Sequence, residues 1–210
     1  MIRRLCFASC YSYSPVGTGQ PSRHSRLLRS LLKDADARFM EKYAFRVYQQ
    51  VEEGSAALRG YFGEDDILVP VPGSAPESVD RAWVACHLAE ALVSQGLGLD
   101  SWRGLRRITS VPKSAYAATG ARPSIDCHYD SFALATPLYQ PRSIILIDDV
   151  VTKGRTLLAA AVRLHEAFPS TRIKAFALMR TMSRVTDINY LLEPCRGEIR
   201  WRNGDAIRRP

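Results

Sequence analysis

The sequence predicts an α/β domain built on a mainly parallel sheet flanked by helices. Segments that are typical of strands alternate with segments that are typical of helices, and this order implies parallel pairing through right-handed crossovers. Residues 144–147 form a continuous, mostly β-branched apolar run, which is typical of a strand buried on both faces. A chain of 210 residues that is 46% hydrophobic suffices for one sizeable core, so we expect a single domain over residues 1–210.

The first half of the chain predicts two helices followed by a strand and a third helix. Helices are expected at 25–33 and 35–53, because apolar residues of the second recur in four-residue steps and mark one face. An apolar strand at 67–71 leads into the loop Pro72-Gly73-Ser74, and 77–94 has the pattern of the helix that follows it. These last segments form a first strand, loop and helix unit.

The second half predicts further strands at 105–108, 132–135, 143–147 and 173–179, with a helix at 155–168. Residues 109–130 are polar and irregular, and a long excursion of this kind inside a compact domain is usually a functional flap or a misread element. Near the end, residues 198–202 precede Asn203-Gly204, a pair that favours a tight hairpin turn.

The chain carries an excess of positive charge, with 29 Lys and Arg residues against 21 Asp and Glu residues and a formal net charge of +8. This balance suits an anionic ligand or nucleic acid without choosing between them. The segment 23–33 and the tail arginines could form a nucleic-acid surface, although solvated charge is the favoured interpretation. These tail arginines are Arg196, Arg200, Arg202, Arg208 and Arg209. No apolar run approaches the roughly 18 to 20 residues that span a bilayer, so we expect a cytoplasmic protein.

Five cysteines are odd in number and irregularly spaced, which argues against a disulfide framework. Cys6 and Cys10 could begin a zinc site, but no second pair lies nearby and His24 is a solitary candidate ligand. Buried or incidental thiols are therefore the default interpretation.

The strongest chemical signal follows the apolar strand at 144–147. Asp148 and Asp149 come directly after it, at the carboxyl end where open α/β sheets place their ligands. The next residues supply hydroxyls, a flexible glycine and backbone N–H groups just before a helix, whose first turn favours anions. They are Thr152, Lys153, Gly154, Arg155 and Thr156. Carboxylates beside a phosphate cradle suggest a sugar phosphate with a metal ion.

Other phosphate sites fit this pattern less well. An acidic pair after a buried strand also suits a nucleotide hydrolase, but the chain has no G-x-x-x-x-G-K-[ST] string, and Gly17-Thr18-Gly19 lacks the lysine. A receiver-type phosphoacceptor site would not need a Gly-x-Thr turn directly downstream. An ordinary capped helix explains either threonine alone, but not the carboxylates, glycine and threonines together.

Residues 144–156 resemble the phosphoribosyl-diphosphate (PRPP) signature of type I phosphoribosyltransferases, an apolar strand followed by two acidic residues and a turn closing in Gly-x-Thr. The ComF-like, amidophosphoribosyltransferase-related branch is favoured by the Val-Pro-Val-Pro sequence at 69–72, by Arg122 and Phe132, and by the segment 175–178. The N-terminal four-cysteine zinc element of that branch is absent.

The resemblance implies a type I phosphoribosyltransferase fold with a small hood, to which residues 1–65 and 109–130 would contribute, and with 181–210 as a C-terminal appendage. Asp148 and Asp149 would engage the ribose hydroxyls, directly or through metal-bound water, and residues 152–156 would hold the 5-phosphate. Lys153 and Arg155 depart from the family turn and add positive charge there. The diphosphate and Mg²⁺ would meet Pro72, Gly73 and Ser74, and the cations that could reach the diphosphate are Lys113, Arg106, Arg107 and Arg122.

The function implied is transfer of a phosphoribosyl group from PRPP, with Mg²⁺, to an unknown nitrogenous acceptor with release of diphosphate. The alternative is a non-catalytic PRPP-binding regulator that acts on nucleic acid or on a protein partner. A homodimer is left open. His87, His128 and His165 lie outside the motif, and we expect them to pack or to face the surface rather than to act as general bases.

Overall fold

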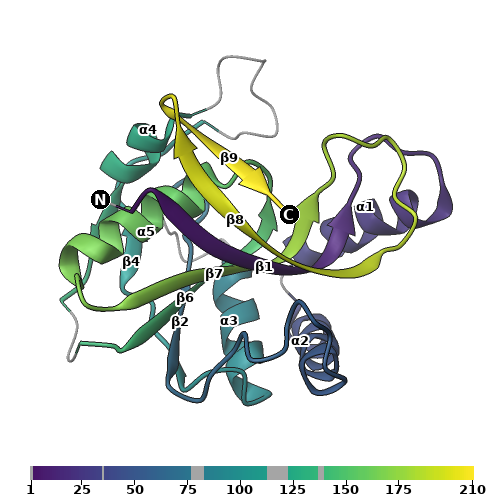
Figure 1. The fold of residues 1–210 in the computed structure, drawn as a ribbon, viewed down its shortest axis with the longest axis horizontal. Coiled ribbons are helices and arrows are strands. Elements are labelled where there is room, and N and C mark those ends of the chain that lie inside the picture. The colour runs from purple at the N-terminus through teal and green to yellow at the C-terminus, as the bar shows by residue number, and fades with distance from the viewer. Residues whose placement is uncertain (1, 35, 77–82, 113–122, 137–139) are drawn as a thin grey trace.

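A computed structural model describes residues 2–34, 36–76, 83–112, 123–136 and 140–210, and it contains a seven-stranded sheet in the order β3-β2-β6-β7-β1-β8-β9 (Figure 1). The strands are β1 (Arg4–Tyr13), β2 (Asp66–Pro70), β3 (Asp100–Ser101), β6 (Ser143–Val151), β7 (Arg172–Thr181), β8 (Leu192–Arg202) and β9 (Asp205–Arg209). The pairs from β3 to β1 are all parallel, whereas β8 and β9 are antiparallel to their neighbours. The predicted mainly parallel sheet is therefore confirmed.

Helices cover both faces of this sheet. On one face lie α2 (Ala37–Glu52) and α3 (Val84–Ser94), and on the other lie α4 (Ile125–Asp130) and α5 (Arg155–Ala167) (Figure 1). Strand β6 is buried on both sides as predicted, because Ile145 and Ile147 join one hydrophobic cluster while Ile144 and Leu146 join the other. The α/β class with helices flanking the sheet is confirmed.

Two smaller elements lie near the carboxyl ends of the parallel strands. Helix α1 (Gln20–Lys33) projects beyond the end of β1 (Figure 1). Strands β4 (Leu105–Arg107) and β5 (Phe132–Leu134) pair antiparallel in a separate two-stranded sheet, with α4 between them in the chain. Both elements stand at the edge of the main sheet where we expected a ligand.

The two ends of the chain lie closer to the centre of the sheet than we expected. Residues 4–13, which fell within the expected hood segment 1–65, form β1 between β7 and β8. The segment 181–210, which we expected to be an appendage, supplies β8 and β9 to the same sheet. The predicted tail hairpin is confirmed, with Asn203 and Gly204 both at positive φ, as a tight two-residue turn requires. Among the described residues, no helix is both long and apolar enough to cross a membrane.

Candidate functional site

The carboxyl ends of β2 and β6 bring three predicted segments together. Pro70 pairs with Ile147 in the parallel register, and the Val71 N–H donates to the Ile147 carbonyl oxygen at 2.9 Å. The loop 72–74 therefore leaves the sheet beside the aspartates, which lie within β6 because this strand continues past the expected end at residue 147 to Val151. Both line a cavity of about 580 Å³, and residues 152, 153 and 156 of the turn after β6 line it too.

Asp148 and Asp149 are partly buried neighbours that form no close ion pair with a described residue, and the nearby charge of Arg107 only partly offsets the raised pKa of Asp148. The Asp149 N–H donates to Asp148 Oδ1 at 2.9 Å, and neither carboxylate forms a salt bridge with any described residue. Burial, and then the negative charge of Asp149, raise the pKa of Asp148 well above its usual value. A bound cation or a set of hydroxyl donors would relieve this unfavourable charge.

The turn after β6, residues 152–156, has the geometry of an anion cradle. Gly154 lies in the left-handed region at a φ of 86°, and α5 begins at the next residue. No side chain caps α5, so the orphan N–H groups of its first turn are left for an anion. A small cavity of about 40 Å³ lies inside the turn and is lined by residues 150–157 together with Asp148 and His128.

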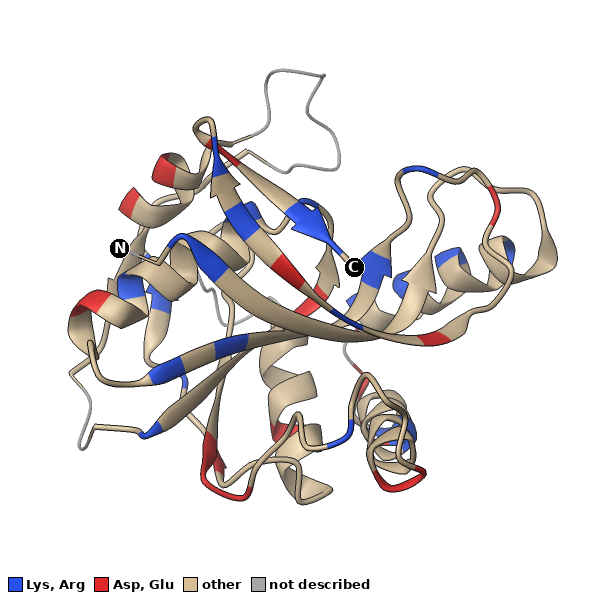
Figure 2. Ribbon diagram, in the orientation of Figure 1, with Lys and Arg blue, Asp and Glu red and all other residues tan. Residues whose placement is uncertain are grey.

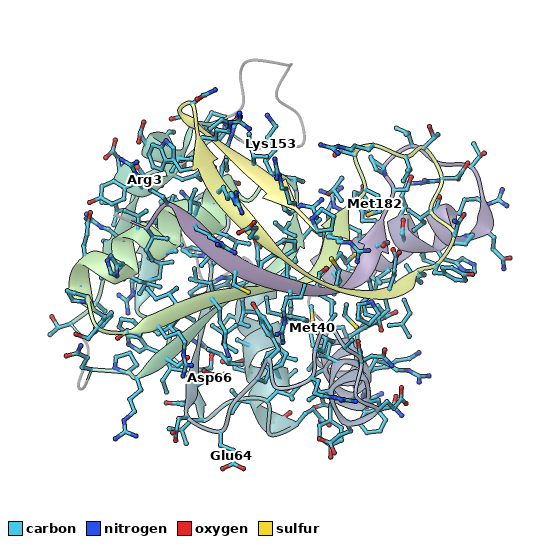
Figure 3. All side chains as sticks on the ribbon, viewed as in Figure 1. Arg3, Met40, Glu64, Asp66, Lys153 and Met182 are labelled. Atoms are coloured by element: carbon cyan, nitrogen blue, oxygen red, sulfur yellow. The ribbon has the colours of Figure 1, made fainter. Side chains whose placement is uncertain are left out.

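Lys153 and Arg155, the two residues that add positive charge to this turn, both pair with the carboxylate of Asp205 in β9. Asp205 Oδ2 lies 3.0 Å from Lys153 Nζ and 2.8 Å from Arg155 Nη2. The hydrogen bond from Arg155, and then that from Lys153, hold the pKa of Asp205 well below its usual value. Figure 3 shows Lys153 beside the β8–β9 hairpin. The single negative charge of Asp205 thus compensates one of the two positive charges expected beside the phosphate.

The β8–β9 hairpin also holds the backbone of the turn. Arg208 Nε donates to the Thr152 carbonyl oxygen at 2.7 Å, and its Nη2 donates to the Thr181 carbonyl oxygen at 2.5 Å. The Ile199 side chain packs so closely on Gly154 that an added Cβ there would lie 2.5 Å from Ile199 Cδ1. Sequence reasoning missed these supports, because they join segments about fifty residues apart and follow no local pattern.

His128 on α4 is a second residue that the sequence did not assign to the site. It is only 4% exposed, its Nε2 lies 3.4 Å from Thr156 Oγ1, and its Nδ1 has no described hydrogen-bond partner. Burial, and then the charges of Arg107 and Arg155, lower the pKa of His128 to about 4. A neutral imidazole therefore lines the cavity at pH 7, and no motif in the sequence marks it.

Of the four cations proposed for the diphosphate, Arg107 is the one that the structure places at the cavity. Its buried guanidinium donates to the carbonyl oxygens of Pro72 and Gly73 and lies 4.4 Å from the centre of the Phe132 ring. Burial lowers the pKa of Arg107 to about 10, which leaves it charged at pH 7. Arg106 is exposed and does not line the cavity, and Lys113 and Arg122 lie outside the described residues.

The donor atoms at the site suit a magnesium ion held jointly with a ligand. Within the described segments, no group of three or more His, Cys, Asp or Glu side chains could hold a metal ion alone. Mg²⁺ binds through one or two carboxylates and completes its shell with water and phosphate oxygens, which the unpaired aspartates allow. Cys6 is exposed and Cys10 is buried, where burial raises the pKa of the thiol to about 12.

Comparisons with known proteins give only distant matches. No protein-family model matches this chain, and no curated protein matches it. Two crystal forms of a hypoxanthine phosphoribosyltransferase from Staphylococcus aureus are similar to it. The tetragonal form has a TM-score of 0.39 and 11% identity over 72% of this chain and 70% of that chain. The orthorhombic form has a TM-score of 0.33 and 12% identity over 71% and 72%.

A third similar structure is described as a glutamic acid mutant from an analysis of an invariant aspartic acid in HPRTs. It has a TM-score of 0.35 and 16% identity over 75% of each chain. At similarities this low, we take no residue role from these three structures.

We expect Asp205→Asn to lower the free energy of unfolding by about 0.5–1 kcal/mol at pH 7, because a partly exposed ion pair is screened by solvent. The pKa of Asp205 is depressed in the folded state, so its stabilisation is full above the unfolded pKa and is lost as the pH falls through the folded pKa. Melting curves should show a constant gap between wild type and D205N above pH 5 that narrows below about pH 4.

The matched control is Asp65→Asn, which changes an exposed aspartate without a described side-chain contact. D65N should melt like the wild type throughout. A gap for D205N that widened in acid would contradict the ion-pair assignment.

We expect His128→Gln to remove a pH dependence of stability between pH 6.5 and 4. In this window the unfolded chain protonates His128 at its usual pKa of 6.5, whereas the folded chain keeps the ring neutral down to about pH 4. The unfolded state therefore binds more protons, and this residue costs the wild type about 2–3 kcal/mol as the pH falls. Urea unfolding at pH 7, 5.5 and 4.5 measures the difference between wild type and H128Q.

The exposed His24 provides the control, since His24→Gln should keep the wild-type pH profile. Identical pH profiles for H128Q and wild type would show that His128 is not held neutral.

Proposed function

We propose that this chain is a type I phosphoribosyltransferase that binds PRPP with Mg²⁺ and transfers the phosphoribosyl group to a nitrogenous acceptor. The observation that supports it is one cavity lined by an unpaired carboxylate pair, an uncapped helix start behind a left-handed glycine, and the loop 72–74. Such a cavity offers separate places for a phosphate, for ribose hydroxyls and for a second anionic group.

In this proposal each part of PRPP meets a different segment. The 5-phosphate lies in the turn 152–156, where N–H groups of α5 and the threonine hydroxyls donate to its oxygens. The ribose hydroxyls donate to Asp148 and Asp149. The diphosphate lies against the loop 72–74, which Arg107 holds through its carbonyl oxygens.

The transfer breaks the bond between the anomeric carbon and the diphosphate oxygen, and the diphosphate leaves with the electron pair. The acceptor nitrogen bonds to the same carbon and releases its proton to solvent. The two carboxylates favour the positive charge that develops on the ribose, so catalysis is largely positioning and electrostatics. Mg²⁺, when bound, would offset negative charge on the departing diphosphate.

The start of the expected flap contributes to the same cavity. Val111 and Pro112 line it, and the Val111 N–H donates to the Ser74 carbonyl oxygen at 2.7 Å. An apolar cover of this kind would exclude water, which competes with the acceptor for the anomeric carbon. We also propose that residues 109–130 contribute to a hood over the site and that the chain belongs to the ComF-like branch. A cytoplasmic location and a homodimer are part of the same proposal.

Calorimetry with PRPP and Mg²⁺, followed by an assay of diphosphate release with a panel of bases and amines, tests this function. An enzyme should bind PRPP and release diphosphate only with a suitable acceptor. Absence of PRPP binding would contradict the site. Binding without release for any acceptor, together with a changed affinity for DNA or RNA, would instead favour the regulatory alternative.

A further inference from the structure

The cavity continues past the aspartates to the carboxyl ends of β7 and β1. Thr181 at the end of β7 pairs with Tyr13 at the end of β1, and the Met182 N–H donates to the Tyr13 carbonyl oxygen at 2.8 Å. Thr181, Ser183, Tyr13 and Pro15 line the same cavity as Asp148 and Asp149. Strand β1 lies two positions from β6, and Tyr13 lies four residues beyond Ser9, the β1 residue level with Asp148. Tyr13 is therefore roughly 10 Å across the sheet and about 13 Å along the strands from Asp148.

Helix α1 adds a cation to this end. Arg29 Nη1 donates to the Tyr13 hydroxyl oxygen at 3.2 Å, and its guanidinium carbon lies 5.2 Å from the centre of the Tyr13 ring. The Arg29 side chain is partly buried and lines the cavity. Figure 2 shows further Lys and Arg residues on α1 at this edge of the sheet. The Tyr13 ring thus holds the guanidinium in a fixed place.

Arg29 differs from the other described cations that line the cavity because, among the described residues, it forms no ion pair and no hydrogen bond to a backbone carbonyl oxygen. Lys153 pairs with Asp205, and Arg107 is used on the loop carbonyls. For Arg29, no carboxylate of the described residues lies within salt-bridge distance. Its guanidinium therefore retains donors for an anionic ligand group.

Thr181, Tyr13 and Pro15 form the wall at the same end of the cavity. The Thr181 hydroxyl oxygen is buried and has no hydrogen-bond partner among the described residues. Because protein atoms cover this oxygen completely, it does not face the open cavity, and Thr181 contributes to the wall through its position at the end of β7. Tyr13 and Pro15 add flat, largely apolar surfaces to this end of the cavity.

We propose that the end of the cavity formed by Tyr13, Arg29 and Thr181 binds a planar acceptor that carries an anionic group, as an aromatic carboxylate does. This rests on the proposed phosphoribosyl transfer. A carboxylate matches the planar fork of Arg29, and the cavity of about 580 Å³ that Arg29 and the aspartates both line has room for a ring with a substituent beside the ribose. The negative aspartates repel the anionic end, so the acceptor points its nitrogen toward the ribose.

Calorimetry on protein saturated with ribose 5-phosphate and Mg²⁺, which cannot react, tests this specificity. The probes are three matched pairs: nicotinate with nicotinamide, orotate with uracil, and 2-aminobenzoate with 2-aminobenzamide. At least one carboxylate should bind about tenfold more tightly than its neutral partner, the effect of one charged hydrogen bond. Arg29→Gln should remove that preference, and Arg29→Lys should retain part of it.

Arg23→Gln is the matched control, because Arg23 is exposed on the same helix, and this variant should keep the wild-type preference. Equal binding within every pair by the wild type, or a preference that persists in R29Q, would overturn the inference. The comparison of each carboxylate with its neutral partner uses the wild-type protein, so it does not depend on whether a variant folds. PRPP binding without a carboxylate preference would overturn this inference alone, whereas no PRPP binding would overturn the proposed function itself.

Discussion

The double substitution Asp148→Asn with Asp149→Asn is expected to remove measurable binding of PRPP and Mg²⁺. Each carboxylate that accepts a hydroxyl donor contributes about 1.5–3 kcal/mol, so loss of both charges weakens binding by at least about a hundredfold. The neutral amides also attract Mg²⁺ far less than carboxylates do. Calorimetry of wild type and variant with PRPP and Mg²⁺ measures this loss.

The same variant should be at least as stable as the wild type. The raised pKa of Asp148 means that its ionised form is disfavoured in the fold, so stability from this group is lost as the pH rises above the usual aspartate value. Asparagine removes that cost, and the melting temperature at pH 7 should rise. Lost binding with retained stability would identify residues kept for a ligand rather than for folding.

Asp126→Asn with Asp130→Asn is the matched control, since it removes two exposed carboxylates from α4, away from the aspartate pair. This control should bind PRPP as the wild type does. Wild-type affinity in the Asp148 and Asp149 variant would show that the ribose lies elsewhere.

Gly154→Ala is expected to destabilise the protein by about 2–3 kcal/mol and to weaken phosphate binding more than tenfold. Its φ of 86° costs a residue with a Cβ about 1–2 kcal/mol, and the added Cβ would lie 2.5 Å from Ile199 Cδ1. Relief of that clash must move either the turn or β8, and both hold the first N–H groups of α5 in place. Urea unfolding and calorimetry with ribose 5-phosphate measure the two effects.

Gly60 offers a control with the same backbone requirement and open space. It has a φ of 60°, and an added Cβ would meet nothing within 4 Å. Gly60→Ala should therefore show the backbone cost of about 1–2 kcal/mol without loss of phosphate binding. Adding Ile199→Ala to Gly154→Ala should recover the steric part, whereas equal stability of G154A and G60A would exclude the clash.

The parts of this fold that the sequence predicted correctly are those whose signal is local. Strand β6, the two aspartates and the glycine turn occupy consecutive positions, so one continuous pattern contained them all. The loop 72–74 was found because it directly follows an apolar strand. Their convergence on one cavity follows from parallel pairing of β2 with β6, which brings carboxyl ends to one edge.

The parts that were missed depend on contacts between distant segments. Strand β1 carries alternating aromatic and small residues, which we did not assign to a strand, and its position between β7 and β8 explains why nearly all of it is buried. The ion pairs of Asp205 with the turn could not be predicted, because the residues next to Asp205 in the sequence do not indicate which distant cations it contacts. In the sequence Arg29 is one of several basic residues in the segment 23–33, and only its contacts with Tyr13 distinguish it from the others.

The position of β1 in the sheet determines when this strand can pair during synthesis and folding of the chain. Arg4 pairs with Arg200 and Phe7 pairs with Ala175, so β1 is flanked by two strands that follow it at a long distance in the sequence. On the ribosome β1 must wait for β7 and β8, which are synthesised well over a hundred residues later, before either of its edges is covered. Pairings of such long sequence separation slow folding and leave strand edges open to aggregation. We therefore expect both edges of β1 to stay open to other chains until β7 and β8 have been synthesised.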